Sequence, residues 1–227
     1  MARLLTQILG VMSGSIGDIV FKRRGGRSYV SAHPSGYTSR TDAATVARKK
    51  QFKTAVEIAK NINSIPLLKA VWPTDPSKLV SKFQKMVSVN YKLVSGEDLT
   101  GQPTLTPTFG FEMTTPVVTL AADSVHFAAG QLGVNLGIDT SIEKFFSVSG
   151  IIVMKSPTDL LSQDINVLKF TTGHQNLDLI TDISVTIPLS GIDQQILAKY
   201  TVKRAFFAFL TLDDNNNVVK YSATYGS

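Results

Sequence analysis

The sequence predicts an α+β protein that is mainly β, with an N-terminal β-hairpin and helices followed by an antiparallel β-sandwich. Three observations lead to this fold class. Two strand-like runs flank a Gly-Gly pair near the N-terminus, periodic apolar positions follow it, and about seven short runs rich in Val, Ile, Phe and Thr fill the second half. We therefore divide the chain into an N-terminal arm (1–40), a helical region (41–95) and a β-sandwich domain (96–227).

The hairpin is predicted from residues 16–22 and 27–31, which have strand composition. Gly25 and Gly26 between them supply the two positive φ angles that a type I′ turn requires. In that register Arg24 faces Arg27, and like charges that pair directly across strands are mildly destabilising. The arrangement therefore indicates an anionic partner at the tip. The other interpretation is a solvated turn whose arginines keep an exposed edge from aggregating.

Three helices are expected next. The first is capped by Ser39 or Thr41 and runs to about Asn61, the second covers residues 67–72, and the third begins at Asp75-Pro76. The apolar stripe expected on the first helix is Phe52, Ala55, Val56, Ala59 and Ile62. The apolar face expected on the third is Leu79, Val80, Phe83, Met86, Val87 and Val94. Its opposite face is a lysine stripe made of Lys78, Lys82, Lys85 and Lys92, which is more typical of a solvated surface than of a nucleic-acid site.

From about Gly96 the pattern changes from helical to β. Residues 96–110 are rich in Gly, Thr and Pro, which predicts a linker. The strand-like runs beyond it, separated by polar or glycine turns, are 116–122, 125–129, 145–154, 164–170, 182–189, 200–212 and 217–225. Strands at this spacing favour an antiparallel sandwich. The run at 196–200 can also form a helical turn.

Composition excludes several classes of protein. Of 227 residues, 43% are apolar and 18% are charged, which is typical of a folded globular chain. Cysteine is absent, so disulfides, thiolate metal ligands and a cysteine nucleophile are excluded. The apolar run at the N-terminus is short and interrupted, which indicates a mature start and not a secretory signal. No other apolar run approaches the ~20 residues of a membrane span, so we expect no membrane partner.

Catalytic patterns are also lacking. The sequence contains no GxSxG, P-loop or GxGxxG motif, and His33, His126 and His174 are far apart without metal-ligand spacing. The acidic run Asp213-Asp214 with the three asparagines after it resembles a calcium loop in composition only, and a hairpin turn explains it better. We therefore expect no enzyme, no cofactor and no metal.

Charge is distributed unevenly along the chain. Residues 1–92 hold 16 Lys and Arg against four acidic residues, a formal charge of +12, whereas residues 93–227 carry −6. An N-terminal half of this kind is expected to meet an anionic surface, and the two halves can attract each other between copies.

The sequence resembles a known family at its N-terminus and its C-terminus. Residues 13–34, SGSIGDIVFKRRGGRSYVSAHP, and the helix ATVARKKQFKTAVEIAK before a Trp-Pro pair resemble the N-terminal pattern of small proteins found in bacteriophage structural modules and in Bacteroidota genomes. The last strand pair, FFAFLTLDDNNNVVKYSATY, resembles the closing hairpin of that family. Ser31 and Thr45 stand where members often have Arg and Gln. The resemblance implies a non-enzymatic virion component with immunoglobulin-like sandwich modules.

These observations lead to one main function and three alternatives. The main expectation is a phage structural protein of the neck, tail or capsid surface, assembled in several copies and bound to other virion proteins. The residues expected to contact a partner are Lys22, Arg23, Arg24, Arg27, Arg40, Arg48 and Lys49. The first alternative is a sequence-independent nucleic-acid-binding protein that uses the basic half, with Tyr29 and Tyr37 as its best stacking residues and at most weak affinity. The second alternative, an adhesin-type sandwich, needs an export route, and the N-terminus offers none. The third alternative, an enzyme, needs a catalytic motif that the chain lacks.

Overall fold

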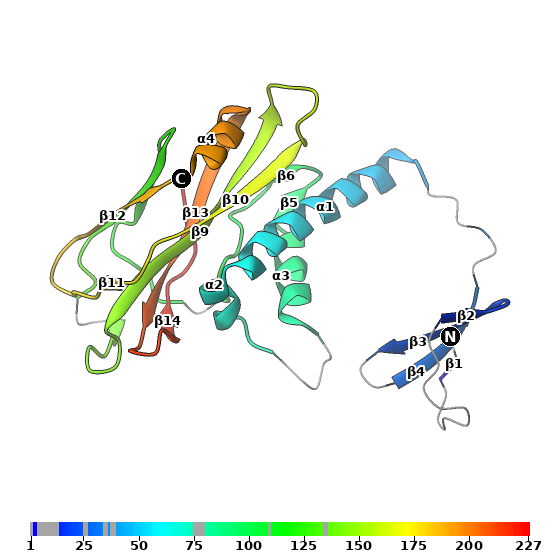
Figure 1. Ribbon diagram of the computed structural model, residues 1–227, viewed down its shortest axis with the longest axis horizontal. Coiled ribbons are helices and arrows are strands. Elements are labelled where there is room, and N and C mark those ends of the chain that lie inside the picture. The colour runs from blue at the N-terminus through cyan, green and yellow to red at the C-terminus, as the bar shows by residue number, and fades with distance from the viewer. Residues whose placement is uncertain are drawn as a thin grey trace. The chain divides into compact units, whose positions relative to one another are not determined.

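The computed structural model describes residues 2–3, 14–24, 27–33, 36, 40–74, 80–108, 110–133 and 136–227. It divides the chain into two compact units, 1–43 and 44–227, which are described separately below. Figure 1 labels the elements of both. The protein is α+β and mainly β, and all the pairings between its named strands are antiparallel, so the predicted fold class is confirmed at this level.

The first unit is a four-stranded sheet with the order β1-β4-β3-β2. Its strands are β1 (Ala2–Arg3), β2 (Gly14–Ile16), β3 (Ile19–Arg24) and β4 (Arg27–Ala32). The predicted hairpin is confirmed as β3 and β4. Its first strand begins at Ile19, later than expected, because Gly17 has a positive φ of 54° and turns the chain between β2 and β3. Gly25 and Gly26, the expected turn, lie outside the described residues.

The second unit carries four helices among its described residues. They are α1 (Ala43–Ser64), α2 (Pro66–Val71), α3 (Lys82–Tyr91) and α4 (Gly191–Ala198). The third helix begins later than predicted, because Ser81 and Gln84 form a capping box that starts it there. Asp75 and Pro76 lie outside the described residues, and Val94 belongs to a strand.

The strands of the second unit form two sheets and a small hairpin. The six-stranded sheet contains β9 (Phe145–Pro157), β10 (Ile165–Thr171), β11 (Gln175–Asn176), β13 (Tyr200–Leu212), β14 (Val218–Tyr221) and β15 (Tyr225–Gly226). The three-stranded sheet contains β7 (Val117–Leu120), β8 (Ser124–Ala129) and β12 (Ile183–Pro188). The hairpin is β5 (Val94–Ser95) with β6 (Asp98–Leu99). All seven predicted strand regions are confirmed, and the run before Tyr200 is helical, as α4.

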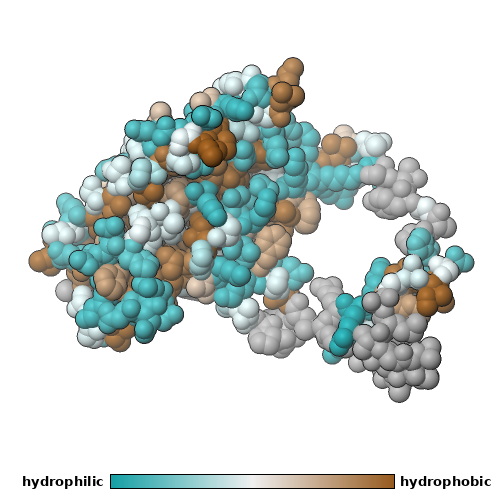
Figure 2. Space-filling model, viewed as in Figure 1, coloured by the Kyte–Doolittle hydropathy of each residue, from teal (hydrophilic) through white to brown (hydrophobic). Residues whose placement is uncertain are grey.

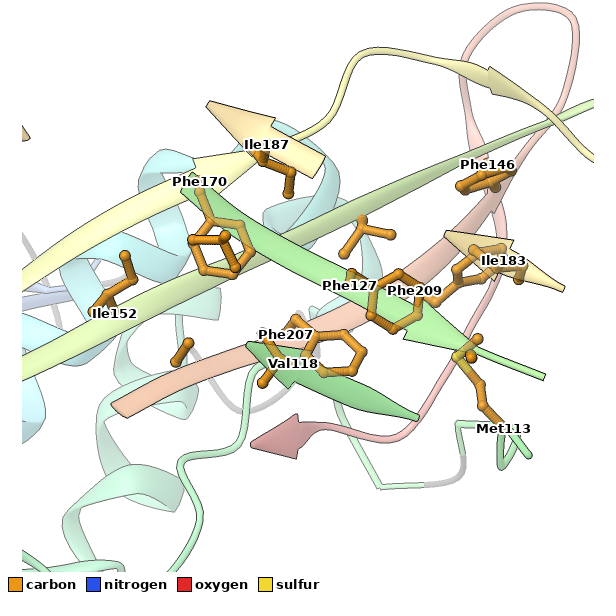
Figure 3. Close-up of a cluster of buried hydrophobic side chains, with 14 of the residues drawn as sticks. Met113, Val118, Phe127, Phe146, Ile152, Phe170, Ile183, Ile187, Phe207 and Phe209 are labelled. Carbon is orange, nitrogen blue, oxygen red and sulfur yellow. The ribbon is translucent and has the colours of Figure 1, made fainter. Parts of the chain in front are cut away.

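Two hydrophobic cores lie on opposite faces of the six-stranded sheet. The sandwich core, between this sheet and the three-stranded one, includes Phe127 of β8, whose ring centroid is 4.5 Å from that of Phe207 of β13. Figure 3 shows these two rings together in that core. The helix-side core packs Ile58 of α1 and Met86 of α3 against Phe206 of β13. The central strands β9 and β13 are therefore buried on both faces, which explains their long apolar runs.

The stretch predicted as a linker is instead packed against the rest of the unit. Leu105 is fully buried, its carbonyl accepts a hydrogen bond of 2.9 Å from Trp72 Nε1, and its N–H donates to Thr224 Oγ1. The buried side chain of Asn90 donates to Thr104 O and accepts from Thr104 N. Threonines and prolines gave this stretch a loop composition, but its polar groups are satisfied by the fold. The helices and the sandwich therefore belong to one unit.

Candidate functional site

The β3–β4 hairpin positions the cationic residues that the sequence singled out. Its register pairs Arg24 with Arg27, Arg23 with Ser28 and Lys22 with Tyr29, so the expected juxtaposition of Arg24 and Arg27 is confirmed in the backbone. Alternation along the strands gives the small sheet two different faces. The pairs Ile19–Ala32 and Phe21–Val30 share one face, and the pairs Lys22–Tyr29 and Arg24–Arg27 share the other.

Lys22, Arg23 and Arg27 of this hairpin have no acidic partner among the described residues. The side chains of all three are exposed. Ser28 is the one buried side chain among the described residues of this unit. Within the described residues these three cations therefore contribute no ion pair to the sheet.

The remaining predicted contact residues lie elsewhere. Arg40 is exposed and follows the small sheet in the same unit. Arg48 and Lys49 are exposed near the start of α1 in the second unit, where Arg48 Nε donates to Ala44 O at 3.2 Å. The structure thus brings four of the seven residues onto one hairpin, which we call the basic tip: Lys22, Arg23, Arg24 and Arg27.

The histidines and acidic residues do not assemble into a metal centre in the part of the chain that is described. No group of three or more His, Asp or Glu side chains there could hold an ion. His126 Nε2 lies 3.2 Å from Ser184 Oγ on the exposed face of the three-stranded sheet. Asp213 accepts hydrogen bonds from Asn215 N, Asn217 N and Asn217 Nδ2, and that from the Asn217 side chain lowers the pKa of its carboxyl most. The predicted hairpin turn is confirmed there.

No helix in the described part of the chain has the length and apolar character that crossing a membrane requires.

One buried carboxylate, that of Glu143, was not expected from the sequence. Glu143 is 1% exposed, and its carboxylate accepts hydrogen bonds from Thr211 Oγ1 and from Asp139 N, the latter at 2.9 Å. Lys220 Nζ lies 3.3 Å from its Oε1 atom. Because both oxygens are engaged by the fold, Glu143 fastens the segment before β9 to β13 and β14. No motif surrounds it in the sequence, so only its burial identifies it.

Replacing Glu143 by Ala should destabilise the protein by about 2–3 kcal/mol, because Thr211 and the Asp139 N–H lose their buried acceptor. Lys220→Met should also destabilise the protein, by about 1–3 kcal/mol, because it leaves the buried Glu143 carboxylate without its counter-charge. Urea unfolding followed by tryptophan fluorescence measures both, and a variant as stable as the parent would contradict this account.

Comparisons of this chain with protein-family models, with curated proteins and with solved structures find no match.

Proposed function

We propose that this protein is a non-enzymatic structural component of a bacteriophage virion, at the neck, tail or capsid surface, which assembles in several copies through its N-terminal arm. The observation that carries the docking role is the basic tip, a hairpin of a separate compact unit whose described cations have no acidic partner. The virion assignment is supported by the resemblance of residues 13–34 and the helix after them to proteins of bacteriophage structural modules. Carboxylates or phosphates on a neighbouring surface would supply the missing counter-charges.

The globular unit supports a scaffolding role. Two antiparallel sheets enclose its sandwich core, which fits the immunoglobulin-like module that we propose for this part of the chain. Helices α1, α2 and α3 add to that plan by covering the outer face of the larger sheet. A rigid unit of this kind, carrying a separate charged hairpin, suits repeated assembly on a symmetric surface.

A second candidate function is sequence-independent binding of nucleic acid. It is favoured by the position of Tyr29, a half-buried aromatic residue directly across the strands from Lys22 and on the same face as the Arg24–Arg27 pair. An aromatic ring among cations can stack on a base while the cations neutralise phosphates. Such binding would weaken steeply as the salt concentration rises.

The proposal is tested by replacing Arg23, Arg24 and Arg27 together with Ser. The melting temperature should stay level or rise slightly, because a like-charge cross-strand pair costs a few tenths of a kcal/mol. Incorporation into purified particles should be lost, because charge-assisted contacts contribute about 1.5–3 kcal/mol each. Calorimetry and quantitative gel analysis of particles measure the two effects.

A matched control removes three exposed charges elsewhere, with Lys85, Lys169 and Lys203 replaced by Ser. This control should incorporate normally. Normal incorporation of the triple arginine variant would show that the tip is only a solvated turn. If that variant incorporates normally but loses DNA binding at low salt, the second candidate replaces the first.

A further inference from the structure

An apolar groove lies between helices α1 and α3. It has a volume of about 530 Å³, and its apolar lining comes from Phe52 and Val56 of α1 and from Phe83, Val87 and Tyr91 of α3. The 3.6-residue period placed Phe52 in the core, but its side chain is 56% exposed. Ala55, Ala59 and Ile62 of the predicted stripe are buried, together with Ile58, which the stripe did not include. Exposed aromatic surface of this kind usually marks an interaction site.

The walls of this groove are tied together. Gln51 Nε2 of α1 donates to Tyr91 O at 2.9 Å and to Val94 O at 2.6 Å, where α3 ends and β5 begins. Thr54 Oγ1 donates to Gly96 O at 3.3 Å in the following turn. These bonds hold α1 against the C-terminal end of α3 and the turn after it, and the groove is open in this arrangement. It is a preformed site, and binding there needs little ordering of the protein.

Charges around the groove indicate what it can accept. Lys92 lines it, exposed Lys53 follows Phe52 on α1, and no carboxylate is among the lining residues. An apolar occupant that carries acidic groups is therefore complementary to it. The basic tip of the N-terminal arm is not, because its cations would meet these lysines.

An acidic and apolar element of the required kind stands at the end of the β9–β10 hairpin. Leu160 and Leu161 are 104% and 99% exposed, and residues 156–164 contain Asp159 and Asp164 but no cation. A cation from outside this range, Lys199, has its Nζ atom 3.9 Å from Asp159 Oδ2. In Figure 2 apolar residues in brown project at the top of the molecule, where Figure 1 shows this hairpin end. We call residues 158–164 the leucine tip.

The leucine tip is held in a defined conformation. Asp159 Oδ1 accepts hydrogen bonds from Leu161 N at 3.0 Å and from Ser162 N at 2.6 Å, and Ser162 Oγ donates to Oδ2. The bond from Ser162 Oγ is the main reason why the pKa of Asp159 is lowered. At its base, Thr158 N donates to Lys199 O, and Tyr200 OH donates to Gln163 O. The two leucines are thus presented to solvent by an ordered turn.

We propose that the leucine tip of one copy of this chain inserts into the groove between α1 and α3 of a second copy, a contact that rests on the multi-copy assembly proposed above. Leu160 and Leu161 fill the apolar floor. Asp164 lies toward Lys53 and Lys92 of the other copy, and Asp159, which already pairs with Lys199 of its own copy, adds to the negative charge on that side. Because tip and groove are different surfaces, the contact is heterologous and continues into a ring or a filament.

The test uses two full-length variants, each with one half of the contact. The tip variant carries Leu160→Ser and Leu161→Ser, and the groove variant carries Phe52→Asp. Sedimentation velocity over a concentration series should show self-association of the parent chain and at least a roughly hundredfold weakening in each variant, since two buried leucines are lost or a charge opposes them. Their melting temperatures should match the parent, because the replaced side chains are exposed.

Mixing the two variants gives the decisive result. The tip variant keeps an intact groove and the groove variant keeps an intact tip, so an equimolar mixture should form dimers that do not grow further. A control with Ile180→Ser and Ile192→Ser, which removes exposed isoleucines outside both surfaces, should associate like the parent. A monomeric parent, unchanged association of either variant, or no pairing in the mixture would overturn the contact.

Failure here and failure of the proposed function can be told apart. The tip and groove variants keep the basic tip, and the triple arginine variant keeps the leucine tip and its groove. If copies pair in solution through tip and groove but the arginine variant still incorporates into particles, only the docking role of the arm is lost. If the arginine variant loses incorporation but the mixed variants do not pair, only the leucine-tip contact is lost.

Discussion

Deletion of residues 1–40 should leave a folded protein that no longer enters the assembly. No described residue of the first compact unit contributes to either hydrophobic core of the second, so the melting temperature should change by no more than about 2 °C, which corresponds to less than 1 kcal/mol for a domain of this size. Incorporation into particles should fall below detection, because the deletion removes the whole basic tip. Circular dichroism, calorimetry and gel analysis of particles measure these effects.

The truncated chain also has an internal control. It keeps the leucine tip and the α1–α3 groove, so its concentration-dependent association in solution should equal that of the full chain. Normal incorporation of the truncated chain would remove the arm from the docking role. A large loss of melting temperature would contradict the independence of the two units.

Replacement of Gly150 by Ala should strongly destabilise the second unit. A Cβ atom at this position of β9 would lie 2.1 Å from Phe206 O and 2.5 Å from Phe170 Cζ. The first of these is a backbone atom of the neighbouring central strand and cannot rotate away. We expect destabilisation of roughly 3 kcal/mol or more, because strands buried on both faces tolerate overpacking poorly. Urea unfolding of the purified variant measures it.

A second glycine provides the matched control. Gly191 begins α4, and a Cβ atom there would meet no heavy atom within 4 Å. Gly191→Ala should therefore be neutral or stabilise by up to about 1 kcal/mol, because Ala favours the helix and restricts the unfolded chain. A Gly150→Ala protein as stable as its parent would show that β9 and β13 are less closely packed than described.

Local sequence rules predicted those elements whose formation depends on local chemistry. The Gly-Gly pair with strand-like flanks predicted the hairpin and the Arg24–Arg27 register, and the apolar runs predicted every strand region of the sandwich. The start of α3 also depends on local chemistry, the capping box of Ser81 and Gln84, although the Asp75-Pro76 pattern predicted an earlier start. In each of these cases the residues that decide the structure are neighbours in sequence.

Rules of this kind failed where distant residues compete for the same surface. Periodicity predicted an apolar stripe on α1 of which Ala59 and Ile62 are buried with Ile58 in the helix-side core, whereas Phe52 at its start is exposed in the groove. Composition predicted a linker at 96–110, but Trp72 and Asn90 bind its backbone. Glu143 was invisible for the same reason, because its partners Thr211 and Lys220 are about 70 residues away.

The sequence by itself determined the α+β class, the strand regions, the separate basic hairpin and the opposite charges of the two halves, since each depends on residue type, short-range spacing or simple counting. Only the tertiary structure decided that helices and sandwich share a unit and that Glu143 is enclosed. It also decided that an apolar groove beside lysines stays open between α1 and α3, and that an apolar tip with acidic residues is exposed. Burial and exposure are properties of the packed chain, because each side chain's share of solvent depends on residues far away in sequence.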